Sequence, residues 1–164
     1  MIAELDRLRQ RYGRLLVWLL WAHVPVMGLA ALWNKAMPVP MALAISALVA
    51  AIYQLTFLRC GTSPVTRNIA TVALIGEPSL LLLLFAGHPW QMDMHMYFFA
   101  TLALVIGWCD WRPVVVAALA VAAHHLMLNF VFPYAVFPLG ADLPRVYLHA
   151  SIVAFQTVVL VWLS

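Results

Sequence analysis

The sequence predicts an all-α membrane protein, a polytopic bundle of six transmembrane helices with both termini in the cytoplasm. Of its 164 residues, 66% are hydrophobic and only 9% are charged, whereas a soluble domain is about 45–50% apolar and about 25% charged. The mean hydropathy is +0.97. Six apolar segments come close to the roughly 20 residues that a helix needs to cross a bilayer. Because backbone polar groups inside lipid must be satisfied within each segment, we expect all six to be helical.

Short connections join the six predicted spans, so that sequential helices should be antiparallel neighbours. The spans are residues 14–33, 39–57, 67–86, 92–108, 113–132 and 145–164. Residues 1–13 precede them and carry apolar side chains at helical spacing among polar ones. This amphipathic segment should be a helix that lies along the inner interface or extends the first span into the cytoplasm. Residues 14–164 then form one six-helix transmembrane domain.

The basic residues predict the orientation, because cytoplasmic loops of membrane proteins carry the excess of Lys and Arg. If the N-terminus is cytoplasmic, only Lys35 and Arg145 lie outside. The basic residues on the inner side are then Arg7, Arg9, Arg11, Arg14, Arg59, Arg67 and Arg112. The net charge of +3 therefore reflects membrane topology, and no nucleic-acid partner is expected. The bilayer itself, in a bacterial inner membrane, is the predicted environment.

Two polar residues lie deep in the first and third predicted spans. In the first, Pro25 can bend the helix beside His23, which is either aimed inward as a ligand or hydrogen-bonded to a neighbouring carbonyl. In the third, Glu77 lies near the middle of the bilayer, where a carboxyl group is protonated, paired or turned to a polar cavity. A histidine or Gln156 is the expected partner. The second span has no such residue and is expected to serve packing.

The stretch between residues 87 and 99 is the most unusual part of the chain. It reads Gly-His-Pro-Trp-Gln-Met-Asp-Met-His-Met-Tyr-Phe-Phe. Polar groups of this kind are costly inside hydrocarbon and usually face a bundle interior. Met92, His95, Met96 and Phe99 should share one helix face by their spacing. Asp93 should lie near the outer boundary, and the stretch should form the mouth and first wall of a metal or cofactor site.

The last two predicted spans bring further histidines to the outer half of the membrane. His124 and His125 are adjacent, with Asn129 one turn later, and His149 lies one turn into the final span. Since adjacent residues differ by about 100° around a helix, only one of the pair can face a common point well. The other could bond to Glu77 or Asn129. The loop between these spans is either a lid or a plain connection.

Counting residues along each helix places the histidines at a shared depth. His95, His124, His125 and His149 come from three spans, with His23 close below and His88 at the outer rim. Imidazole is the commonest transition-metal ligand, so this convergence predicts a metal or haem site. Thioethers beside imidazoles suit copper, and Met92 and Met96 favour it. Haem b, held by His95 with His149 or His124, is the close alternative; zinc ranks below both.

A family resemblance rests on several phrases of the sequence. They are the stretch just described, Asp110-Trp111-Arg112-Pro113, Ala123-His124-His125-Leu126, Asn129-Phe130, Arg145-Val146 and His149-Ala150. The chain resembles the N-terminal membrane region of certain bacterial methyl-accepting chemotaxis proteins and diguanylate cyclases. The resemblance implies a six-span sensor, not itself an enzyme, that acts as a homodimer. It implies that the last span continues into a cytoplasmic signalling module, which this chain lacks.

Two other functions remain possible on sequence alone. A small haem-binding electron carrier or redox enzyme would use the same histidines, although such proteins usually place redox centres at two depths. A metal transporter would use Glu77, the bend at Pro25 and the outer methionines as a path. The inner half of the predicted bundle offers few polar groups for either function. A sensor with Glu77, Asn129, Asp93 and Gln156 around its ligands is therefore the preferred interpretation.

Overall fold

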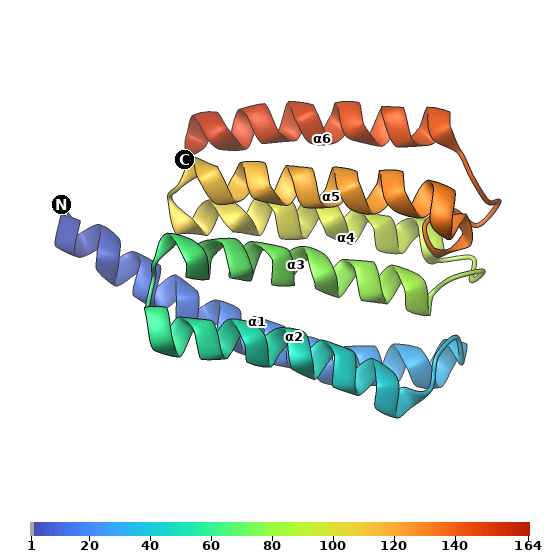
Figure 1. The fold of residues 1–164 in the computed structure, drawn as a ribbon, viewed down its shortest axis with the longest axis horizontal. Helices are drawn as coiled ribbons and strands as arrows, with labels where there is room; N and C mark the ends of the chain where they lie inside the picture. The colour runs from blue at the N-terminus through green and yellow to red at the C-terminus, as the bar shows by residue number, and fades with distance from the viewer. Residues whose placement is uncertain (1) are drawn as a thin grey trace.

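The computed structural model describes residues 2–164, and every described element is helical. The α-helices are α1 (Ile2–Asn34), α2 (Val39–Cys60), α3 (Pro64–Leu84), α4 (Gln91–Leu104), α5 (Trp111–Val131) and α6 (Leu143–Leu163). Two short 3₁₀ helices, η1 (Val105–Trp108) and η2 (Pro133–Ala135), follow α4 and α5. The long helices lie side by side as an elongated bundle, and both ends of the chain lie at the same end of it (Figure 1). The all-α prediction is confirmed.

Five of the helices are long and apolar enough to cross a membrane, and α4 is the exception. The sequence predicts one continuous span over residues 92–108. In the structure α4 has 14 residues and then tightens into the four-residue η1. Residues 2–13 belong to α1, which runs unbroken for 33 residues. Its N-terminal part extends beyond the rest of the bundle (Figure 1).

The change from α4 to η1 coincides with close packing against the N-terminal part of α1. The Tyr12 hydroxyl donates a hydrogen bond to the carbonyl of Leu104. The guanidinium of Arg9 donates to the carbonyls of Trp108 and Cys109, at 2.9 and 2.8 Å. These side chains satisfy carbonyls at the end of a helix, which lack partners in the helix itself. At Gly107 a Cβ atom would lie 2.3 Å from the Tyr12 ring, so only glycine permits this approach.

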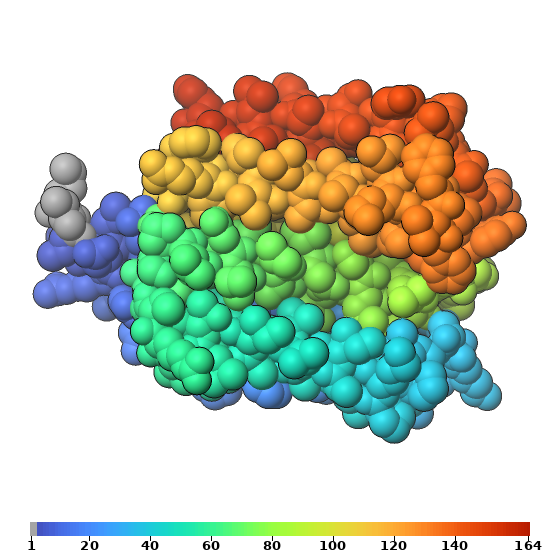
Figure 2. Space-filling view, viewed as in Figure 1, coloured from blue at the N-terminus to red at the C-terminus, as the bar shows by residue number. Residues whose placement is uncertain are grey.

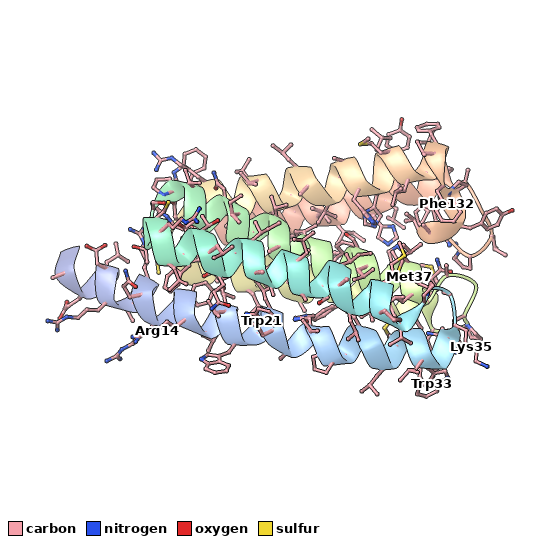
Figure 3. The ribbon with its side chains drawn as sticks, turned by 60° about the horizontal axis from the view of Figure 1, so that its bottom comes forward. Arg14, Trp21, Trp33, Lys35, Met37 and Phe132 are labelled. Carbon is pink, nitrogen blue, oxygen red and sulfur yellow. The ribbon has the colours of Figure 1, made fainter. Side chains whose placement is uncertain are left out.

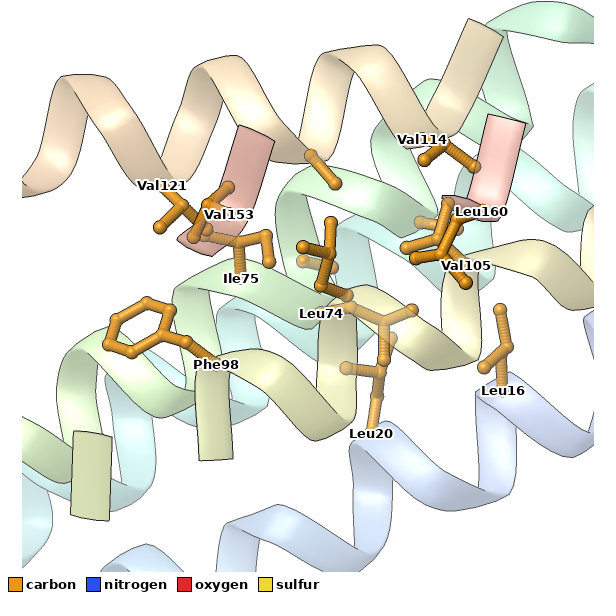
Figure 4. Packing of buried hydrophobic residues seen from close by; sticks show 14 of the residues in the cluster. Leu16, Leu20, Leu74, Ile75, Phe98, Val105, Val114, Val121, Val153 and Leu160 are labelled. Carbon is orange, nitrogen blue, oxygen red and sulfur yellow. The ribbon is translucent and has the colours of Figure 1, made fainter. Parts of the chain in front are cut away.

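Helix α3 is the centre of the bundle and contacts α1, α2, α4 and α5. The other helices surround it, and α6 packs mainly on α5 at one edge (Figures 1 and 2). The main apolar core combines residues from all six α-helices (Figure 4), among them Leu16, Tyr53, Leu74, Phe98, Val121 and Val153. This core holds α4, α5 and α6 in the register that brings their polar residues together.

Polar residues mark the two ends of the bundle. Figure 3 shows Trp33 and Lys35 at the same end as Phe132, with Arg14 toward the other end. At the Arg14 end, Arg67 of α3 forms a buried ion pair with Asp110, whose other oxygen accepts from the backbone of Arg112 at the start of α5. The separation of basic residues agrees with the pattern from which the orientation was predicted.

Candidate functional site

Four imidazoles meet between α4, α5 and α6, and we call them the histidine cluster. They are His95 of α4, His124 and His125 of α5, and His149 of α6. The ring centres of His95 and His125 lie 5.4 Å apart, and His149 lies 5.7 Å from each of them. Three helices thus contribute one ring each to a nearly equilateral triangle.

Each ring of this triangle is anchored by the same local hydrogen bond. The Nδ1 atom of His125 lies 2.9 Å from the carbonyl oxygen of Val121, and that of His149 lies 2.8 Å from the carbonyl of Arg145. For His95 the distance to the carbonyl of Gln91 is 3.3 Å. A carbonyl can only accept, so Nδ1 carries the proton, and in the neutral imidazole Nε2 then keeps its lone pair. This is the neutral form in which imidazole binds a metal ion.

The Nε2 atom of His95 has no hydrogen-bond partner although it is buried. The same imidazole lines a small void of about 10 Å³, together with Phe98, Phe99, Val121, His125, His149 and Val153. A volume of this size holds about one water-sized sphere. A buried acceptor without a donor costs free energy. The void and the unpartnered nitrogen together form a place for one small occupant among three imidazoles.

An aromatic ring from the loop between α5 and α6 packs against all three imidazoles of the triangle. Phe137 is fully buried, and its ring lies parallel to the His95 imidazole, with centres 5.8 Å apart and planes at 7°. The loop is held down by Gln91, whose amide donates to the carbonyl of Tyr134 at 2.8 Å. Asn129 also fixes it, by accepting from the backbone N–H of Asp142 at 2.8 Å. The loop is therefore a packed cover over the cluster.

A groove between α5 and α6 reaches the cluster from the side. It has a volume of about 300 Å³, and its wall includes His125, His149 and several alanines. Most of its remaining lining is aliphatic, as expected for a surface that faces hydrocarbon. The site thus has an aromatic cover at the loop and an apolar opening toward the bilayer.

The structure answers which of the two adjacent histidines of α5 faces inward. His125 is buried and belongs to the triangle, whereas His124 is half-buried beside Phe98 and 5.1 Å from His125. Asn129 holds the loop and does not bond to either ring. The 100° step between neighbouring helical residues explains the difference in position.

The other predicted histidines lie outside the cluster. Both nitrogens of His23 are engaged, with the Leu19 carbonyl at 2.7 Å and the Tyr97 hydroxyl at 2.6 Å. His88 lies in the turn before α4, where its Nδ1 accepts from the backbone N–H of Trp90 at 3.1 Å. Neither ring is brought near the triangle.

Of the four residues predicted to share one face of α4, His95 is buried, Met92 and Phe99 are half-buried, and Met96 is exposed. Met96 is 64% exposed, because it lies 100° around the helix from His95. Met92 lies 4.0 Å from the guanidinium of Arg145 through its sulfur atom. The residues of α4 that face the bundle are instead Gln91, His95, Phe98, Thr101 and Leu102.

The predicted supporting residues have partners other than the cluster. Both carboxyl oxygens of Glu77 are bonded by the Ser46 hydroxyl, at 2.9 and 3.1 Å, rather than by a histidine or Gln156. Gln156 donates to the carbonyl of Phe99 at 3.1 Å and so ties α6 to α4. Asp93 is exposed and lines a separate groove with His23, between α1 and α4.

The cluster resembles a metal site in spacing but is not already arranged as one. Among residues 2–164, no three His, Cys, Asp or Glu side chains present their donor atoms around one ready-formed ion position. A metal ion about 2.0–2.1 Å from each Nε2 would hold the ring centres roughly 5–5.5 Å apart. The observed 5.4 and 5.7 Å are close to that spacing, so binding would require the rings to turn and close slightly.

The sequence did not predict the interior positions of three residues, Phe137, Gln91 and Tyr97. Gln91 and Tyr97 lie within the unusual stretch before and in α4, so their composition was a usable signal. Phe137 stands in a loop without periodicity, where nothing in the sequence distinguishes a buried aromatic from an exposed one.

Comparison with known proteins adds no identification: no family model, no curated protein and no solved structure matches the chain. The function must therefore be inferred from the histidine cluster itself.

Proposed function

We propose that this chain is a membrane-embedded sensory input domain that binds a transition-metal ion, with copper favoured, and signals through α6. The observation that carries this proposal is the meeting of three imidazoles, from α4, α5 and α6, around one ion-sized void. Each has Nδ1 bonded to its own helix, which leaves Nε2 as the donor to a metal. Single buried histidines are commonly satisfied by carbonyls, but that does not explain three rings and an unpartnered nitrogen.

The packing of the rings favours a single ion over haem b. A haem held by two axial histidines needs a slot wide enough for a porphyrin between them. Here the three rings and Phe137 are already in mutual contact, with every pair of centres within 6.4 Å. Inserting a porphyrin would require α6 to separate from α5. A haem-binding electron carrier therefore ranks below a metal sensor.

The contacts of α6 suggest how binding could be transmitted. His149 and Val153 of α6 line the void, and Gln156 one turn further donates to the carbonyl of Phe99 on α4. An ion that draws His95 and His149 together would shift α6 against α4. A ligand shifts such an equilibrium only by its difference in affinity for the two arrangements. In this proposal α6 carries the shift to a cytoplasmic module, and the receptor works as a homodimer.

The membrane arrangement completes the proposal. Residues 91–108, which include α4 and η1, would be the sixth span beside the five long apolar helices. The concentration of arginines at the end that holds both termini supports a cytoplasmic location for that end, by the positive-inside rule. The cluster would then lie in the outer half of a bacterial inner membrane.

The test compares metal retention by four purified proteins. The unaltered chain, His95→Ala, His149→Ala and His88→Ala are loaded with copper, dialysed and analysed by elemental analysis and visible absorption. We expect about one copper per chain in the unaltered protein and in the His88→Ala control, because His88 lies outside the cluster. If His95→Ala and His149→Ala both retain copper, or if the protein shows a Soret band in place of copper, the proposal is contradicted.

Signalling is tested separately by joining residues 1–164 to the cytoplasmic half of a characterised chemoreceptor. The output should change when copper is added and should not change in the His149→Ala fusion. A copper response that persists in that variant would refute transmission from the cluster.

A further inference from the structure

We infer that the triangle of His95, His125 and His149 selects a monovalent soft cation, copper in its cuprous state, over divalent copper or zinc. This inference rests on the proposed metal-binding function and adds the charge of the ion to it. It follows from the charge of the ligands, the nature of the walls and the size of the void.

No carboxylate among the described residues offsets the charge of an ion in this void. Its lining consists of three neutral imidazoles and four apolar side chains. Glu77 is bonded to Ser46, and Asp142 forms an ion pair with Arg145 at 3.2 Å. Asp93 lines the other groove. An ion bound by the triangle would therefore keep its full formal charge.

A positive side chain also stands close to the site. The guanidinium of Arg145 lies 5.7 Å from the centre of the Phe137 ring, and that ring stacks on His95. Its charge is offset by Asp142, with which it forms an ion pair at 3.2 Å. This pair therefore adds no anionic ligand to the site, and the preference for a monovalent ion rests on the ligands and walls of the void.

The apolar walls of the site do little to lower the electrostatic cost of burying a charged ion. Phe98, Val121 and Val153 are buried around the void, and the groove between α5 and α6 opens toward hydrocarbon. The cost of moving an ion from water into such a medium rises with the square of its charge, so a divalent ion pays about four times the desolvation cost. No anionic ligand in the lining of the void offsets this cost.

The void also limits coordination number. At about 10 Å³ it holds one small occupant, and a water bound beside the ion would have to lie in the adjoining groove, which is lined mainly by aliphatic side chains. Zinc strongly prefers four ligands, the fourth being water where the protein supplies three. Cuprous ion is stable with three ligands. No methionine lines the void, and the thioether of Met92 contacts Arg145. The site is thus suited to a three-coordinate cuprous ion.

The test titrates the unaltered full chain in nanodiscs, without oxygen, against four separate metal ions. Cuprous ion is measured by competition with bicinchoninate, and silver(I) serves as a monovalent probe that does not change oxidation state. Cupric ion and zinc are measured by competition with chromogenic chelators. We expect one equivalent of cuprous ion, displaced by silver(I), and at least 100-fold weaker binding of zinc and cupric ion.

The outcomes separate this inference from the function on which it rests. Zinc or cupric ion bound as tightly as cuprous ion would overturn the inference while leaving a metal-binding domain. Failure of all four ions to bind would overturn both. A Val153→Asp variant adds a carboxylate to the void wall and should shift the preference toward zinc by at least tenfold. An unchanged preference in the folded variant would overturn the charge argument, and the comparison in the unaltered chain does not depend on this variant.

Discussion

The imidazole of His95 and the phenyl ring of Phe137 stack with their planes 7° apart, although one belongs to α4 and the other to the loop between α5 and α6. Phe137 is fully buried at this position. Aromatic contacts of this kind contribute about 0.5–1.5 kcal/mol beyond their burial. The loop is therefore part of the site, and its opening should control how fast an ion enters or leaves from the outer side.

Phe137→Ala should accelerate release of the bound ion by at least tenfold, because it removes the cover from His95. The equilibrium affinity should fall less than the release rate rises, since no metal donor is lost. Release is measured by stopped-flow transfer of copper to a chelator. The matched control is Phe130→Ala, because Phe130 is 69% exposed and faces away from the cluster. Equal release rates in the unaltered chain and Phe137→Ala would refute the role of the loop as a cover.

Glu77→Gln should retain nearly full stability, whereas Glu77→Ala should lose about 1–3 kcal/mol of unfolding free energy. A serine has one hydroxyl proton, yet the Ser46 oxygen lies within hydrogen-bond distance of both Glu77 oxygens. That geometry is satisfied when Glu77 is protonated and donates in return, as a glutamine amide also can. Unfolding in mixed micelles measures both variants. A Gln variant as unstable as the Ala variant would show that the carboxylate is required.

Gly107→Ala should destabilise the protein by about 1–3 kcal/mol, because the added methyl group would overlap the Tyr12 ring. Gly76→Ala is the matched control, since no atom lies within 4 Å of its added Cβ. Within a helix that change should be neutral or should stabilise by up to about 1 kcal/mol. Thermal unfolding of the three proteins provides the comparison. Equal melting temperatures for the two variants would contradict the packing of α1 on η1.

Cys60 and Cys109 provide a direct test of orientation, because both are free and exposed at the end of the bundle that holds the termini. A membrane-impermeant maleimide should label them in inverted vesicles and leave them unlabelled in intact spheroplasts. A variant with both cysteines replaced by serine gives the background level of maleimide labelling. Labelling in intact spheroplasts would reverse the proposed topology.

The convergence of histidines could be predicted because the rise of a helix per residue is regular. The depth of each histidine along its own helix was therefore sufficient to group His95, His125 and His149. Rotation about each helix axis was not predictable, because it depends on which face packs against α3. For this reason the sequence left His124 and His125 open and assigned Met96 to the face of His95.

Two further features depend on contacts between distant segments. The early end of α4 reflects the approach of Tyr12 to Gly107 across the bundle, and hydropathy alone predicts a continuous span there. Phe137 is placed by the bonds that Gln91 and Asn129 make to its loop. Neither relationship has a periodic signal in the sequence.

The most direct test of the shared site is X-ray absorption spectroscopy on the copper-loaded protein, which identifies the atoms bound to the ion. We predict a first shell of three nitrogen donors with the multiple-scattering pattern of three imidazoles. A first shell that contains methionine sulfur, or fewer than three imidazoles in the unaltered chain, would contradict a single ion bound by α4, α5 and α6.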